Sequence, residues 1–215
     1  KGKAGSIAAL RAAGADLNKQ DEQGITPAHY AARYKHLNII ALLQAKGANL
    51  NIKNKDGETP AHEAAQEGNT EIVLRLNQAG ADLSTQNEEG NTPAHLAALH
   101  SKAETIAALQ QAGAQLNTQN TQGDTPLHMA AEIGSVAVVK ALLEAGVERN
   151  LANSDEQTPI SLLEKSLAQL QEELKLLQDA EEDITSCNEK IESLKTIQQL
   201  LQPESGEEQK GDTTQ

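Results

Sequence analysis

The chain has 215 residues and a mass of 22.8 kDa, which is enough for one or two domains with a sizeable core. Its 31 Asp and Glu residues outnumber its 18 Lys and Arg residues, giving a formal net charge of −13, which argues against DNA, RNA and anionic lipid as partners. With no Phe, no Trp and two tyrosines, the chain also lacks the aromatic platforms on which many nucleic-acid modules stack bases.

A four-residue motif recurs along the chain at a constant step of 33 residues. Thr26-Pro27-Ala28-His29 returns at 59–62, 92–95 and 125–128, and it decays to Thr158-Pro159-Ile160-Ser161. Glycine and leucine columns keep the same step: Gly24, Gly57, Gly90 and Gly123, and Leu10, Leu43, Leu76, Leu109 and Leu142. Several columns in one register indicate an internal structural repeat.

Each copy of the repeat predicts a pair of helices. The Thr of the motif can cap a helix that the Pro opens at its first position, where proline loses no hydrogen bond. An Ala pair such as Ala31-Ala32 gives this first helix a thin face that lets neighbouring repeats approach closely. Ile72, Val73 and Leu76 form an apolar stripe at helical spacing in the second helix. Since neither helix can bury its apolar face alone, stacked repeats must share one core.

These four near-complete copies resemble the ankyrin repeat, whose signature is Thr-Pro-Leu-His-x-Ala-Ala; here Ala mostly replaces the Leu. The resemblance covers about residues 1–165. It implies an all-α solenoid of helix-turn-helix units joined by β-turn or hairpin loops. It also implies a protein that binds other proteins and is not an enzyme.

The start of the chain departs from the repeat. Gly2 aligns with Gly68 and Gly134, the turn between the two helices, so residues 6–13 are predicted to form a second helix without its first. The first repeat is therefore incomplete, and no initiator Met is present. We expect that the chain is a fragment of a longer protein.

The far end departs in another way, because after Pro159 no Gly or Pro occurs until Pro203. A first leucine stripe has heptad spacing: Leu163, Leu167, Leu170, Leu174 and Leu177. A second stripe follows in a shifted phase: Ile184, Cys187, Ile191, Leu194 and Leu201. The phase shift at Glu181 favours a helical hairpin that covers the last repeat. The alternative is one long coiled-coil helix that self-associates through residues 163–201.

The sequence thus divides into three parts. Residues 1–158 are predicted to form the ankyrin solenoid, residues 159–202 a degenerate last repeat running into the helical hairpin, and residues 203–215 a polar, flexible tail. The single cysteine, Cys187, excludes an internal disulfide framework and favours a reducing, cytoplasmic compartment. No uncharged apolar run reaches the length of a membrane span, and no signal peptide is visible.

Catalytic and metal chemistry find no support in the residue pattern. Four of the six histidines fall in the repeat column, at His29, His62, His95 and His128. The family resemblance assigns them a structural role, bonding loop backbone between repeats, and successive repeats lie too far apart for them to share a zinc ion. Cys187 has no nearby histidine and is interpreted as a core thiol. We expect no catalytic residue, no metal and no cofactor.

In ankyrin proteins, partners contact the turn tips and the exposed sides of the first helices, which form a concave face. Carrying those columns over to this chain gives an acidic, partly apolar set. The predicted partner-binding residues are Glu22, Ile25, Tyr30, Arg33, Tyr34, Asp56, Glu58, Glu63, Glu67, Glu88, Glu89, Leu96, Leu99, His100, Asp124, Met129, Glu132 and Ile133. Such a surface predicts a partner protein with a basic segment. The alternative is a solvated acidic face whose apolar residues pack against neighbouring loops.

Three functions remain open at this point. The first is a non-enzymatic scaffold or adaptor that binds a basic segment. The second is an assembly device that oligomerises through the C-terminal helices. The third is the targeting module of a larger enzyme or bacterial effector whose catalytic part lies upstream. The Glu-containing polar tail is similar to those of ankyrin-type effectors that intracellular bacteria inject into a host cytosol; many eukaryotic ankyrin proteins fit as well.

Overall fold

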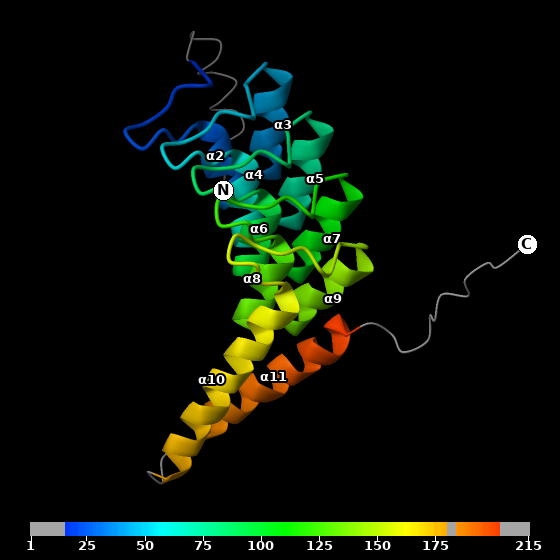
Figure 1. Ribbon diagram of the computed structural model, residues 1–215. Helices are drawn as coiled ribbons and strands as arrows, with labels where there is room; N and C mark the ends of the chain where they lie inside the picture. The colour runs from blue at the N-terminus through cyan, green and yellow to red at the C-terminus, as the bar shows by residue number, and fades with distance from the viewer. Residues whose placement is uncertain (1–15, 180–183, 203–215) are drawn as a thin grey trace, which may run out of the picture.

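The computed structural model describes residues 16–179 and 184–202. All regular elements in these residues are helices, and they stack along one axis as successive antiparallel pairs (Figure 1). The all-α solenoid predicted from the repeats is therefore confirmed. The predicted helix at 6–13, the phase shift at Glu181 and the predicted flexible tail at 203–215 lie outside the described residues.

Four helix pairs follow the 33-residue repeat. The first helices are α2 (Pro27–Arg33), α4 (Pro60–Glu67), α6 (Pro93–Leu99) and α8 (Pro126–Ile133). The second helices are α3 (Leu37–Ala45), α5 (Thr70–Gln78), α7 (Ala103–Gln111) and α9 (Val136–Glu144). First helices pack on first helices and second on second, so the stack has two parallel rows of helices.

Every first helix begins in the same way because the motif supplies both residues of the capping box at its N-terminus. Thr59 has an extended backbone (φ −100°, ψ 169°), Pro60 follows at the first helical position, and His62 completes a capping box with Thr59. The turn that ends α4 then places Gly68 in the left-handed region at φ 76°, where glycine carries no Cβ penalty. Lys35 and Ser101 adopt the same left-handed conformation in their repeats, at φ 55° and φ 57°.

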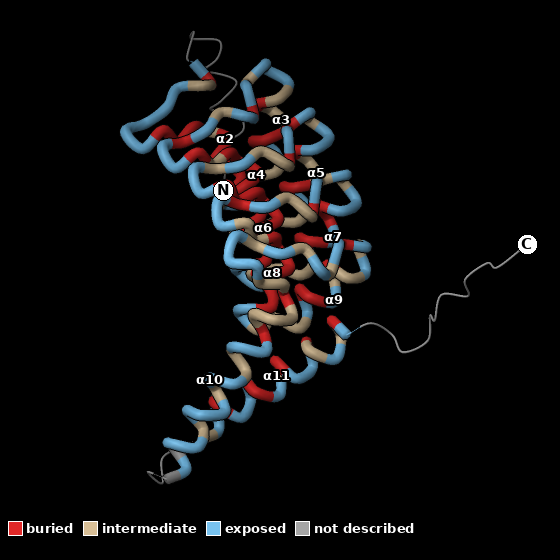
Figure 2. The backbone as a smooth tube through the Cα atoms, in the orientation of Figure 1, coloured by how far each residue is buried: buried red, intermediate tan, exposed pale blue. Residues whose placement is uncertain are grey.

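The core runs unbroken along the stack (Figure 2). Leu43, Leu76, Leu109 and Leu142, the leucine column of the sequence, are each fully buried. The Ala pairs of the first helices are buried to the same extent, which lets neighbouring first helices approach closely. The repeat columns therefore mark the residues that hold one repeat against the next.

The C-terminal segment forms a hairpin, as the phase shift of its apolar stripes predicts, and not one continuous helix. Helix α10 (Pro159–Asp179) packs on α8, and α11 (Thr185–Leu201) packs on α9 and back against α10. Leu163 and Ile197 are fully buried in the common core. The hairpin therefore takes the place of a fifth helix pair and covers the last repeat.

Both hairpin helices are longer than their counterparts in the repeats. Helix α10 has 21 residues where α8 has 8, and the 13 extra residues extend α10 by about 20 Å at 1.5 Å per residue. The far halves of α10 and α11 therefore project past the stack as an arm (Figure 1). Cys187 is buried in this arm, where its thiol donates to the carbonyl oxygen of Leu170 at 3.4 Å.

Candidate protein-binding surface

The four column histidines link each repeat to the next. The backbone N–H of Thr59 donates to Nδ1 of His62 at 3.0 Å, so Nδ1 is the acceptor and Nε2 carries the proton. That Nε2–H donates to the carbonyl oxygen of Asn91, in the turn of the following repeat, at 3.0 Å. His29, His95 and His128 make the equivalent bonds to Glu58, Asp124 and Gln157. The structural role predicted for these histidines is confirmed.

Burial keeps these imidazoles neutral. It lowers the pKa of His62 and of His95 to about 4, and it lowers the pKa of His29 and His128 as well. Within residues 16–179 and 184–202, no three His, Cys, Asp or Glu side chains come together as a metal site. In the same residues, no helix is both long and apolar enough to cross a membrane.

The turn tips form a regular row because each turn bonds to the next. The Glu88 N–H donates to the Asp56 carbonyl oxygen at 3.0 Å, and the Thr121 N–H donates to that of Glu89 at 3.0 Å. This regular spacing directs successive tip side chains to the same side of the stack. Exposed carboxylates of the row include those of Glu22, Asp56, Glu88 and Glu89.

An aromatic pair marks the first repeat of this surface. The rings of Tyr30 and Tyr34 stack with their centroids 6.5 Å apart and their planes within 4° of each other. The Tyr30 hydroxyl donates to the Asp21 carboxylate at 2.9 Å, and this bond raises the pKa of Tyr30. The backbone N–H of Ile25 holds the same carboxylate and lowers the pKa of Asp21. Tyr30 and Tyr34 remain 45% and 60% exposed.

A small hollow brings together apolar and acidic side chains from two further repeats. Leu99 of α6 and Met129 of α8 line it together with Glu89 and Gln122 of the turn tips, and its volume is about 220 Å³. Leu99 and Ile133 are exposed large apolar residues, at 43% and 44%. The hollow therefore brings two apolar side chains and one carboxylate together among neutral polar side chains of the same two repeats.

Not every residue of the predicted set is accessible. Ile25, Glu63 and Leu96 are buried, and Glu63 receives both Nε and a terminal nitrogen of Arg33, at 2.8 and 2.5 Å. The Arg33–Glu63 ion pair therefore cancels the charge of both residues. The remaining predicted residues are exposed or half-buried: Glu22, Tyr30, Arg33, Tyr34, Asp56, Glu58, Glu67, Glu88, Glu89, Leu99, His100, Asp124, Met129, Glu132 and Ile133. We call these fifteen residues the first-helix face.

Sequence reasoning missed Asp21 as the residue that positions the Tyr30 hydroxyl. No family column marks it, because Asn54 occupies the same position in the next repeat and serves the turn alone. The burial of Leu96 was also not predicted from the sequence. Its helix position faces outward in the pattern, yet its side chain is only 5% exposed in the folded chain.

The comparison with known families agrees with the geometry. A family model described as ankyrin repeats, in three copies, matches residues 2–87 and 74–153. No curated protein matches the chain.

Proposed function

Because the chain belongs to the ankyrin-repeat family, whose repeats are generally protein–protein interaction modules and typically not catalytic, we propose that it is a non-enzymatic scaffold. Its partner is a protein, and the first-helix face holds a basic segment of that partner. The repeats within residues 1–158 carry this face, and residues 159–202 close the stack.

The hollow between Leu99 and Met129 is the observation that carries the proposal. Exposed apolar side chains at an otherwise polar surface are typical anchors for a partner. Leu99 and Met129 line the hollow beside the Glu89 side chain, and Glu88 is exposed on the same turn tip. An apolar side chain next to a Lys or Arg would satisfy both parts of this site. The unpaired carboxylates along the tips would steer such a segment toward it.

The test is capture of partner proteins by the chain and by a Tyr34→Ala, Leu99→Ala double variant. Both side chains are largely exposed, so we expect at least tenfold weaker binding with a melting temperature unchanged within a few degrees. Binding to the unaltered chain should also weaken steeply as salt is raised. Equal losses of binding and of stability would show that the two residues serve packing and would refute the assignment.

A matched pair of charge variants tests the basic character of the partner. Glu88→Lys with Glu89→Lys reverses the charge of one turn tip, whereas Glu104→Lys with Glu144→Lys changes the net charge equally on the second helices α7 and α9. We expect only the tip variant to lose the captured partner. Equal loss in both would leave net charge, and not this face, as the cause.

Self-association through residues 163–201 has less support. Ile191, Leu194, Ile197 and Leu201 of α11 are buried within the same chain, so most of the apolar face of α11 packs within its own chain. A mass measurement across a range of concentrations checks this, and a dimer lost on deleting residues 166–202 would favour the assembly function instead.

A further inference from the structure

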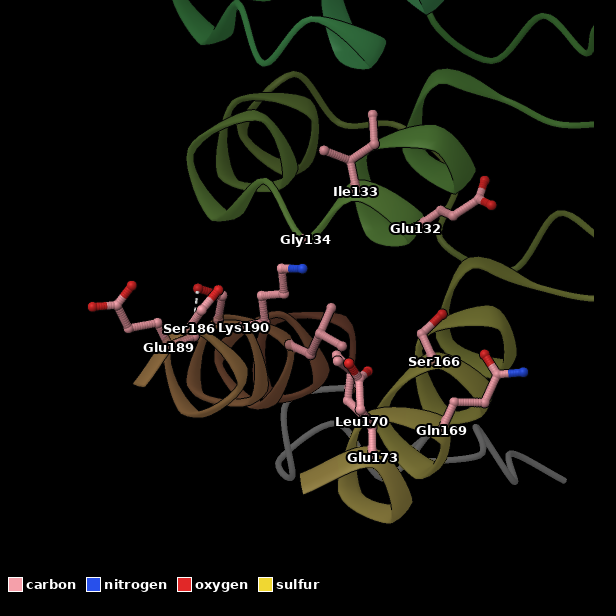
Figure 3. A pocket seen from close by; sticks show the side chains of 12 residues that line it. Glu132, Ile133, Gly134, Ser166, Gln169, Leu170, Glu173, Ser186, Glu189 and Lys190 are labelled. Carbon is pink, nitrogen blue, oxygen red and sulfur yellow. Dashed lines mark hydrogen bonds between the residues drawn. The ribbon is translucent and has the colours of Figure 1, made fainter. Parts of the chain in front are cut away.

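The projecting hairpin leaves a groove between itself and the end of α8. The groove has a volume of about 610 Å³ and is lined by three helices, α8, α10 and α11 (Figure 3). Its apolar lining residues are Leu170 of α10, Leu194 of α11 and Ile133 of α8. The α8 turn passes close above α11, since a Cβ built on Gly134 would lie 3.3 Å from Cδ2 of Leu194. Much of its wall comes from the turns by which α10 and α11 exceed the helices of the repeats.

The rim of the groove is predominantly acidic. Glu132, Glu173 and Glu189 come from three different helices, and Lys190 is the one basic residue among the lining side chains. Across residues 16–179 and 184–202, none of these three carboxylates forms an ion pair. Each is exposed, so each is available to a cation supplied from outside.

We propose that this groove is a second docking site, for a basic segment of a partner protein that places a branched apolar side chain on Leu170 and Leu194. Lys or Arg residues on either side of that anchor would meet the three carboxylates of the rim. Charge complementarity selects this occupant, because an acidic peptide or a nucleic acid would face three carboxylates with one ammonium. The volume suits a peptide anchor, since well-formed ligand sites span about 300–1,000 Å³.

This inference extends the proposed function but depends on other residues. Glu132 and Ile133 at the end of α8 border both the groove and the first-helix face, so one partner chain can run from one to the other. Glu173 and Glu189 line the groove and do not belong to the first-helix face. Variants of these residues therefore test the groove separately.

The test measures binding of a short synthetic peptide of lysines with two leucine anchors, followed by amide chemical shifts of the labelled full chain. The groove variant is Glu173→Gln with Glu189→Gln. Its matched control is Glu164→Gln with Glu172→Gln, which removes the same charge from exposed positions of α10 outside the groove. We expect shifts at Gly134, Leu170 and Leu194, and about tenfold weaker binding at these positions in the groove variant alone.

Equal weakening in both charge variants would overturn the inference, as would equal binding of a peptide with serine in place of leucine, or shifts confined to the first-helix face. The Tyr34→Ala, Leu99→Ala variant separates the two proposals, because it should keep the groove shifts while losing those around Leu99. A concentration-dependent dimer that the groove variant abolishes would identify a second copy as the occupant and would also refute the proposal. Thermal unfolding of each variant verifies that it is folded.

Discussion

Gly57 lies against the backbone of Glu88 in the next repeat: a Cβ built on Gly57 would lie 2.7 Å from the Glu88 nitrogen. That nitrogen donates to the Asp56 carbonyl oxygen at 3.0 Å, so the turns can approach only where no side chain intervenes. The last turn shows the converse. Glu156 fills the same column at φ 60°, and within the described residues no further turn follows it.

The first prediction concerns this close approach. Gly57→Ala should cost more stability than Gly80→Ala, which has a similar φ of 81° but nothing within 4 Å of its Cβ position. Both substitutions carry the left-handed penalty of about 1–2 kcal/mol, and only Gly57→Ala must also separate two turns. Urea unfolding of the two variants gives the comparison. Equal costs would mean that the turns shift freely to admit the methyl group.

The second prediction is a loss of stability in acid. His62 and His95 have a pKa of about 4 in the folded chain and about 6.5 when unfolded, so the unfolded state binds more protons between these values. The contribution of the neutral histidines to the free energy of unfolding is fully present above pH 6.5. It decreases as the pH falls toward 4, by roughly 3 kcal/mol for each histidine. Urea unfolding measured across this pH range gives the slope of the unfolding free energy against pH.

The control for this prediction compares two histidine variants. His62→Gln removes the titrating group and should flatten the pH dependence, although it lowers stability at neutral pH by breaking the bond to Asn91. His95→Gln, which removes the equivalent group one repeat further on, should flatten the pH dependence in the same way. An unaltered slope in the His62 variant would contradict the assignment.

The third prediction concerns the ion pair between α2 and α4. Glu63 has a side chain only 3% exposed and receives Arg33 in a two-point contact, so Arg33→Ala leaves a buried carboxylate without its partner. We expect a loss of about 1–3 kcal/mol. Lys35→Ala, which removes an exposed pair to Glu71 at 3.8 Å, should cost less than about 0.5 kcal/mol. Thermal and urea unfolding of both variants measure the two losses of stability, and equal losses would contradict the prediction.

The fourth prediction concerns the hairpin as the cover of the stack. Ile197 of α11 is fully buried, and Ile197→Ala should cost about 2–4 kcal/mol. Leu176 of α10 is 63% exposed on the arm. Leu176→Ala should therefore change stability little and leave the oligomeric state, measured by light scattering, unchanged. If Leu176→Ala were to dissociate an oligomer, the arm would be a contact between chains.

The sequence by itself determined the repeat, its helices and its core. The sequence repeats every 33 residues, with Thr-Pro at the start of each first helix and a buried leucine such as Leu76 in each second helix. Such helix pairs must stack on one another, because identical amphipathic pairs can bury their apolar faces only against each other. The role of the histidine column followed from the family resemblance, and the bonds to the next turn confirm it. The columns also located most of the first-helix face.

Only the tertiary structure decided which of those surface positions are free. Leu96 and Glu63 follow the same columns as exposed residues, yet both are buried, and Arg33 pairs with Glu63. The groove beside α8 was likewise hidden, because its walls come from segments whose mutual distance depends on where the hairpin turns back. Helical periodicity describes one element at a time, whereas accessibility and grooves arise from how separate elements approach.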